Sequence, residues 1–169
     1  ISNRQTGNRT GRRPDKGQKG RISMARTIES ARRVISGTWG ELWIDGEKVA
    51  EVSACQAKVA LNKETVNLCG RFMTTHKAMN ASGTGSLTLH KVDSGFAQRM
   101  EGIKRGVDRR FTVISKLRDP DSYGAERVAL YDVSFDDLTL ADWQAAAVGS
   151  VTAPFTFSDY EYLDQIEVQ

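Results

Sequence analysis

The sequence predicts a mainly β protein: an antiparallel β-sandwich or barrel with one α-helix, a long extended loop and terminal arms. Polar and apolar residues alternate along several short segments, as they do in strands that bury one face. An Asp-Gly pair separates two of these segments, which favours a tight hairpin turn. Helical spacing of apolar residues occurs clearly in one place, residues 93–106.

The first 23 residues differ from the rest in composition. They contain one acid, Asp15, and seven bases: Arg4, Arg9, Arg12, Arg13, Lys16, Lys19 and Arg21. A segment with so few apolar residues cannot offset the entropy cost of folding alone. We therefore predict a basic disordered arm or a non-native leader at 1–23, and a single β domain at 24–169. A native arm could contact nucleic acid or an acidic neighbour, whereas a leader would make Met24 the natural start.

The domain is expected to open with a hairpin. Residues 38–44 form its first strand, Asp45 and Gly46 form the turn, and residues 47–52 form the return strand. Residues 51–61 continue as a strand. Its more apolar face holds Ser53, Cys55, Ala57, Val59 and Leu61.

Residues 62–82 lack a clear period. The segment is polar, is interrupted by Gly70, and has scattered apolar residues. A stretch of this length without structure is unusual inside a compact domain. Two interpretations stay open: a pair of irregular strands, or a segment that packs against something outside the domain.

A strand at 86–92 precedes the predicted helix. Asp93 or Ser94 can cap the amino end of the helix with a side-chain oxygen. Phe96, Met100 and Ile103 recur at helical spacing. Gly106 is suited to the residue just beyond the carboxyl end of the helix.

The remaining strands are predicted at 107–117, 127–135 and 151–162. Pro154 should confine the first half of the last strand to a sheet edge. Residues 138–148 are ambiguous between helix and strand. In the strand at 127–135, one face holds Ala129, Tyr131, Val133 and Phe135, and the other holds Val128, Leu130, Asp132 and Ser134.

The sequence contains no recognised catalytic, nucleotide-binding or metal-binding motif. The histidines, His76 and His90, have no spacing that suggests a metal site or a catalytic group. We expect no enzyme activity, no cofactor and no metal.

Cys55 and Cys69 are expected to be reduced thiols, although they could face each other across a hairpin. The large aromatic residues expected in the core are Trp39, Trp43, Phe155 and Phe157.

Charge is distributed unevenly along the chain. Arg127 is the last base, and the residues after it contain eight acids: Asp132, Asp136, Asp137, Asp142, Asp159, Glu161, Asp164 and Glu167. The acids could pair with bases of the same chain across a solvated surface. Alternatively, an acidic patch of one subunit could face a basic patch of the next, in a head-to-tail assembly.

Five segments in order resemble the PBSX-type phage tail tube family. These segments are residues 36–47, 62–71, 75–86, 126–135 and 154–160. The resemblance implies a structural subunit of the inner tube of a contractile tail, or of a phage-tail-like particle. Such subunits form stacked hexameric rings around a conduit for DNA ejection.

The resemblance also implies partners and a location. The partners would be other copies of the chain, the tail sheath protein, the tape-measure protein, the baseplate hub and the tail terminator. DNA would be present only in transit, and no small-molecule substrate is expected. The protein would reside in the virion tail after assembly in the bacterial host cytoplasm.

Candidate interface residues follow from this resemblance together with the irregular segment. The loop that reaches a neighbouring subunit would include Asn62, Lys63, Glu64, Arg71, Phe72, Met73, His76 and Lys77. Acidic candidates for an interface or for the tube lumen are Asp132, Asp136, Asp137 and Asp142. Polar candidates for the lumen are Ser86, Thr88 and Thr112. The alternative function is a small β-barrel nucleic-acid-binding module that uses the basic arm.

Overall fold

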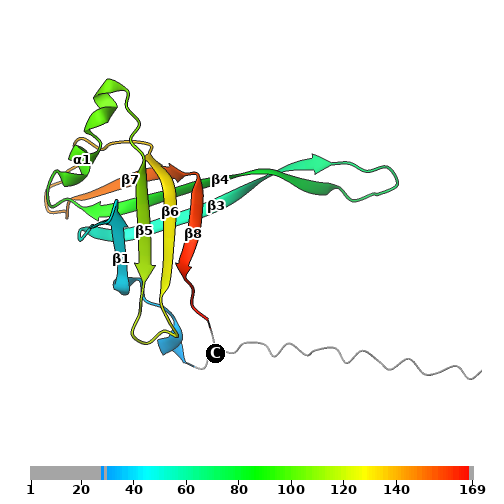
Figure 1. Ribbon diagram of the computed structural model, residues 1–169, viewed down its shortest axis with the longest axis horizontal. Helices are drawn as coiled ribbons and strands as arrows, with labels where there is room; N and C mark the ends of the chain where they lie inside the picture. Colours follow the sequence, from blue (N-terminus) through cyan, green and yellow to red (C-terminus); the bar gives the residue numbers. More distant parts are fainter. Residues whose placement is uncertain (1–27, 29, 168–169) are drawn as a thin grey trace, which may run out of the picture.

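The computed structural model describes residue 28 and residues 30–167, so the predicted arm at 1–23 lies outside the described residues. The fold is mainly β, as predicted (Figure 1). The strands are β1 (Gly40–Ile44), β2 (Glu47–Lys48), β3 (Val52–Val66), β4 (Thr75–His90), β5 (Phe111–Leu117), β6 (Glu126–Phe135), β7 (Ser150–Phe157) and β8 (Asp159–Asp164). The helical segments are α1 (Gly95–Arg99) and the 3₁₀ turns η1 (Ala31–Arg33), η2 (Gly37–Trp39) and η3 (Glu101–Arg105).

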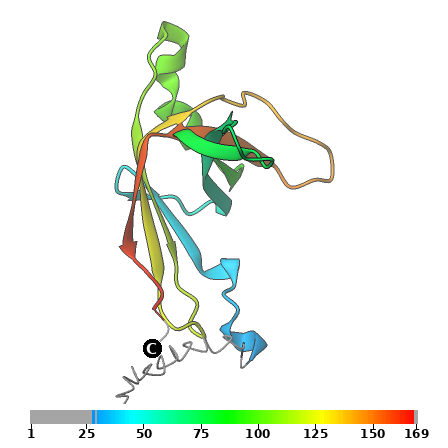
Figure 2. The ribbon, with the colours of Figure 1, turned by 90° about the vertical axis from the view of Figure 1, so that its right-hand side faces the viewer.

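The strands form two layers that share β6. Strands β2, β1, β5, β6 and β8 pair in one layer, which we call the upright sheet. Strand β3 pairs with β4, β4 pairs with β7, and β7 pairs with the end of β6. These strands run across the first layer and form what we call the crossing sheet (Figures 1 and 2). All pairings are antiparallel. The core lies between the layers, as in an orthogonal β-sandwich.

The predicted Asp-Gly hairpin is confirmed. Asp45 and Gly46 have φ values of 51° and 83°, as a primed two-residue turn requires. The predicted return strand at 47–52 is too long, because β2 ends at Lys48. The chain turns there and enters β3, whose first residue pairs with Leu89 of β4. Residues 47–52 therefore join two layers instead of completing one strand.

A β-bulge in β6 breaks the alternation predicted for residues 127–135. Phe111 is opposite Val133 whereas Val113 is opposite Leu130, so β6 contains one extra residue between these pairs. Asp132 lies in this interval with a φ of 57°. Leu130 and Val133 consequently both enter the core, although they belong to opposite predicted faces.

The predicted helix at 93–106 is interrupted. α1 ends at Arg99, and after Met100 the chain continues as the 3₁₀ turn η3. At the amino end, the Asp93 carboxylate accepts a hydrogen bond from the Gly95 amide at 2.7 Å. Gly106 has a φ of 71°, which confirms its expected place at the carboxyl end. Residues of low helix propensity, Gly95 and Gly102, weaken a continuous helix here.

Two other sequence predictions concern the last third of the chain: residues 138–148 and the strand at 151–162. Residues 138–148 form neither a helix nor a strand. The strand predicted at 151–162 is divided at Ser158 into β7 and β8, which belong to different layers. The edge position of Pro154 is confirmed, because pairing of β7 with β6 begins only at Phe155.

A row of phenylalanine rings runs through the core. The centroid distances are 5.0 Å for Phe96 to Phe135, 6.0 Å for Phe135 to Phe155, and 6.3 Å for Phe155 to Phe157. Phe155 is completely buried and Phe157 nearly so, as the sequence predicts. The row connects α1 to the strand that supports β4.

Two glycines of β4 make room for the end of this row. A Cβ atom on Gly83 would lie 2.6 Å from the Phe157 ring. A Cβ atom on Gly85 would overlap the Phe155 ring and the carbonyl oxygen of Gln56. Side chains at these two positions are therefore excluded by the packing of β7 on β4.

The tryptophans are placed differently from the prediction. Trp39 is half exposed, and Trp43 is only partly buried. The ammonium groups of Lys48 and Lys116 lie 5.9 and 5.8 Å from the Trp43 ring centroid. Both lysines also bind Glu41, at 2.6 and 3.1 Å. Hydrogen bonds from Lys48 and Lys116 lower the pKa of the Glu41 carboxyl.

The buried carboxylate of Asp119 connects the start of the described chain to the turn between β5 and β6 through hydrogen bonds. Asp119 accepts hydrogen bonds from the backbone amides of Asp121 at 2.9 Å and Ser36 at 2.8 Å. These two bonds lower the pKa of Asp119. The bond to Ser36 positions η2, and with it the entry into β1.

The Gly85→Ala substitution is expected to destabilise the fold by about 1–3 kcal/mol, because the added methyl group overpacks the contact with Phe155. Chemical denaturation measures the change. Gly37→Ala is the matched control, since a Cβ on Gly37 would meet nothing within 4 Å. Equal stability of the two variants would contradict the packing described here.

Candidate subunit interface

The β3–β4 hairpin extends far beyond the rest of the sheet (Figure 1). Pairing of β4 with β7 ends at the Gly83–Phe157 pair, whereas pairing of β4 with β3 continues to the Thr75–Val66 pair. The part of β4 from 75 to 82 is thus paired on one side only. At about 3.3 Å per residue, this two-stranded part is roughly 25 Å long. The sequence leaves two interpretations of residues 62–82 open. The first, a pair of irregular strands, is confirmed for residues 62–66 and 75–82.

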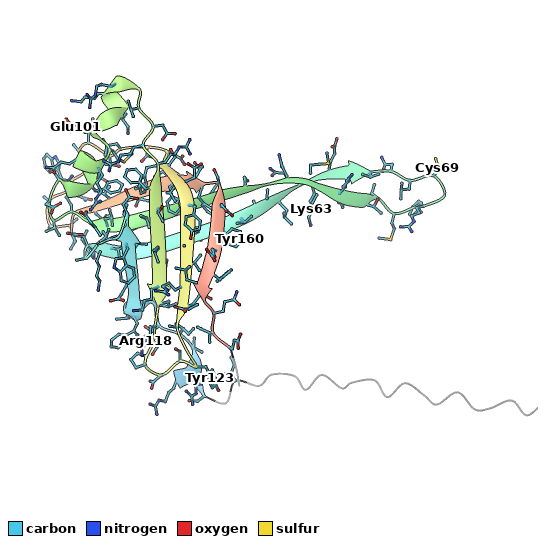
Figure 3. The ribbon with its side chains drawn as sticks, in the orientation of Figure 1. Lys63, Cys69, Glu101, Arg118, Tyr123 and Tyr160 are labelled. Carbon is cyan, nitrogen blue, oxygen red and sulfur yellow. The ribbon has the colours of Figure 1, made fainter. Side chains whose placement is uncertain are left out.

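The hairpin carries every predicted residue of the reaching loop (Figure 3). Asn62, Lys63 and Glu64 are on β3, and His76 and Lys77 are on β4. Arg71, Phe72 and Met73 are in the turn, where Gly70 has a φ of 81°. A register irregularity between Asn62 and Lys63 lies where the hairpin has left the sheet.

Large apolar side chains of the projecting β3–β4 hairpin are bare. Phe72 is fully exposed, and Met73 is 81% exposed. Leu68 and Met79, which are absent from the predicted set, are also exposed, at 48% and 59%. Their apolar character within a polar segment is the sequence signal that could have included them. A cluster of this kind is typical of a protein–protein contact surface.

The four predicted acidic residues separate into two groups. Asp132 accepts a hydrogen bond from the Ser158 hydroxyl at 2.8 Å, and its carboxylate lies 3.6 Å from the Arg110 guanidinium. Asp132 therefore has a role inside the subunit, at the β6 bulge. Asp136, Asp137 and Asp142 instead lie together on the segment 136–149, which we call the β6–β7 loop.

The β6–β7 loop also exposes apolar side chains that sequence reasoning did not select. Leu140, Trp143 and Val148 are 80%, 85% and 80% exposed. No hydrophobic period marks them, so the only sequence signal is large apolar residues within an acidic segment. The loop projects from the body in Figure 2. Like the hairpin, it presents bulky apolar groups to solvent.

A hollow of roughly 340 Å³, lined by apolar and polar side chains, lies under the base of the hairpin. Cys55 and Val59 of β3 face Tyr160 and Tyr162 of β8 across it. Desolvation in this hollow raises the pKa of the Cys55 thiol. Cys69 is at the hairpin tip, so the two cysteines do not face each other and both are free (Figure 3).

The crossing sheet has a polar face directed away from the core. Leu87 and Leu89 of β4 are buried, so the alternating residues Thr84, Ser86 and Thr88 point to the other side. Their strand partners include Gln56, Lys58, Thr152, Pro154 and Thr156. The third predicted lumen residue, Thr112, is on β5 in the upright sheet. It therefore does not share a face with Ser86 and Thr88.

One sheet edge is open along its whole length. Within the described residues, β3 pairs with β4 and with no other strand. An exposed edge of 15 residues presents a row of unpaired backbone groups that another chain can use.

The polar side chains around β6 and β8 form contacts within the subunit. Tyr131 donates a hydrogen bond to Glu161 at 3.1 Å, and this bond raises the pKa of the Tyr131 phenol. Arg127 binds Asp164 at 2.9 Å.

In the part of the chain that the structure describes, no cluster of three or more acidic, histidine or cysteine residues could hold a metal ion. No helix in that part is long and apolar enough to span a membrane.

Solved structures share this fold. A chain of an extracellular contractile injection system, in a complex of sheath and tube in the extended state, aligns with a TM-score of 0.62 and 9% identity. The alignment covers 81% of this chain and 98% of that one. A chain of the anti-feeding prophage tube-terminating cap aligns with a TM-score of 0.64 and 6% identity, covering 86% and 99%. At these identities the likeness concerns the fold alone.

Sequence comparisons identify relatives and a family. The uncharacterized protein YqbM of Bacillus subtilis (strain 168) is 42% identical over 141 residues, which cover 81% of this chain and 95% of YqbM. The phage-like element PBSX protein XkdM of the same strain is 41% identical over 140 residues, covering 80% and 95%. The family model described as phage tail tube protein matches residues 28–164. The chain therefore belongs to the phage tail tube protein family and is a structural subunit of a phage-type tail.

Proposed function

We propose that this chain forms the inner tube of a contractile tail by assembling into hexameric rings that stack. The observation that carries the proposal is the projecting β3–β4 hairpin. A two-stranded ribbon alone is marginally stable in water, and this one exposes both faces as well as Phe72 and Met73. A neighbouring subunit would cover these groups and supply the missing packing.

The open edge of β3 supports ring closure. A strand of an adjacent subunit can pair with this edge and continue the crossing sheet from one copy to the next. The edge of β7 from Ser150 to Ala153 does not pair with β6 and is a second site for such continuation. Repetition of the contact around a rotation axis produces a closed barrel, which has no free edges.

The polar face of the crossing sheet is proposed to line the lumen. Ser86 and Thr88, with Thr84 beside them, present hydroxyl groups and little charge. A lumen lined with many bases would bind DNA phosphates and retain the DNA. A face of this composition would let DNA pass without strong binding. The predicted lumen position Thr112 is not included, because it lies on the other sheet.

The proposed partners are the sheath, the tape-measure protein, the baseplate hub and the tail terminator, with assembly in the host cytoplasm. Support for sheath and terminator comes from the solved structures of like fold, which belong to a sheath–tube complex and a tube-terminating cap. A sheath would contact the outer surface of the rings. A terminator would cover the hairpins or sheet edges left free at the end of the tube.

The first test is negative-stain electron microscopy of the purified chain at increasing concentration. We expect hollow rings or tubes from both the full chain and the chain without residues 1–23, because the proposed contacts lie in the β domain. Loss of rings on deletion of 1–23, together with loss of salt-sensitive DNA binding, would favour the nucleic-acid-binding alternative. Dispersed single subunits at every concentration would contradict self-assembly.

The Phe72→Ser substitution should block assembly without affecting the fold. Phe72 is fully exposed, so it loses no contact in the free subunit. Burial of its ring at an interface would contribute about 1.5–3 kcal/mol per contact. Sedimentation measures assembly, and thermal unfolding measures stability.

Val92→Ser is the matched control, because Val92 is 72% exposed and lies off the hairpin. The control should assemble like the unmodified chain. Normal assembly of Phe72→Ser would contradict burial of the hairpin tip.

A further inference from the structure

Two of the bare apolar surfaces of the described subunit carry opposite charge. The first, which we call the hairpin tip, is residues 63–77; the second is the β6–β7 loop, residues 136–149. The hairpin tip has three bases, Lys63, Arg71 and Lys77, and one acid, Glu64. The β6–β7 loop has three acids, Asp136, Asp137 and Asp142, and no base.

The apolar groups of the two surfaces are also complementary in kind. Phe72 on the hairpin tip is fully exposed, and Met73 is 81% exposed. Leu140 and Trp143 on the β6–β7 loop are 80% and 85% exposed. Aromatic and sulfur-containing side chains pack favourably against each other. Leu138 of the loop packs against the core, whereas Leu140 and Trp143 remain bare.

The two surfaces lie at opposite ends of one strand. β4 begins at the hairpin, where Thr75 pairs with Val66, and ends at His90, which pairs with Ser150 directly after the β6–β7 loop. Figure 1 shows the hairpin and α1 at opposite sides of the molecule, and the loop leaves the body beside α1. A 16-residue strand spans roughly 50 Å. The two surfaces of one copy therefore cannot meet.

The β6–β7 loop is held at both ends and by Leu138, which packs on the core, and it is bare at Leu140, Trp143 and Val148. At its start, the Asp136 amide donates to the Pro154 carbonyl at 2.9 Å. At its end, the Lys91 amide donates to the Gly149 carbonyl at 2.9 Å. The acids Asp137 and Asp142 have no ion-pair partner among the described residues. Fixed ends and an uncovered middle suit a docking site.

We propose that the hairpin tip of one copy docks on the β6–β7 loop of the next copy along the tube. This inference rests on the proposed function and names the two surfaces that meet when rings stack. Because the surfaces are different and lie at opposite ends of the subunit, the contact is head-to-tail and repeats without limit along an axis. Opposite charge fixes which end of a ring accepts the next ring.

Disulfide cross-linking tests the contact directly. Cys69 is already at the hairpin tip, and Gln144→Cys places a new thiol beside Trp143 while keeping the apolar and acidic groups of the loop. Oxidation of assembled Gln144→Cys should give a ladder of covalent multimers on a denaturing gel. Cys69→Ser in the same background should abolish the ladder. Arg118→Cys, an exposed site on the β5–β6 turn, should give none.

The outcome separates this inference from the proposed function. Tubes that form normally but give no ladder would overturn the docking contact and leave the tube function standing. In that case another protein, such as a sheath subunit, would cover the β6–β7 loop. Failure to form tubes from the unmodified chain would instead contradict the proposed function.

Charge reversal gives a second, independent measurement. Arg71→Glu with Lys77→Glu reverses the hairpin tip, and Asp137→Lys with Asp142→Lys reverses the loop. Each double variant alone should need about tenfold more protein to assemble at low salt, because attraction becomes repulsion. An equal mixture should recover assembly, because each reversed surface then meets its complement on the other variant. A mixture no better than either variant alone would overturn the proposal.

Discussion

The packing of Phe155 and Phe157 on two glycines of β4 is the contact on which the rest of the structure depends. Gly85 and Gly83 allow β7 to lie against β4 with its rings in the core, where the phenylalanine row joins the two sheets. The same contact fixes the base of the hairpin and therefore its direction. Beyond Gly83 no phenylalanine supports the strands, and the hairpin continues as a bare ribbon.

The subunit is thus divided into a core that packs on itself and projections that do not. The buried side chains come from both sheets and account for the fold of one copy. The hairpin tip and the β6–β7 loop contribute little to that core and keep their apolar groups in water. This division suits a subunit that folds first and assembles afterwards, since binding can then supply the packing that the projections lack.

Local sequence chemistry was sufficient where neighbours along the chain decide the structure. It predicted the Asp45-Gly46 turn, the Gly106 helix end and the edge position of Pro154. It failed at the β6 bulge, because the extra residue near Asp132 is set by pairing with β5. Among the interface candidates, Phe72 was selected because the family resemblance makes its irregular segment a loop that reaches a neighbouring subunit. The β6–β7 loop was missed as an apolar surface because its exposure depends on the fold and not on a sequence period.

Hydrogen exchange of the backbone amides measures most directly whether a neighbour stabilises the hairpin. In the dispersed subunit, amides of residues 62–66 and 75–80 should exchange much faster than those of Leu87 and Phe155, since only the latter lie in the core. In assembled tubes, the hairpin amides should become as protected as the core. Hairpin amides that are already protected in the dispersed subunit, or that stay unprotected in tubes, would contradict the account.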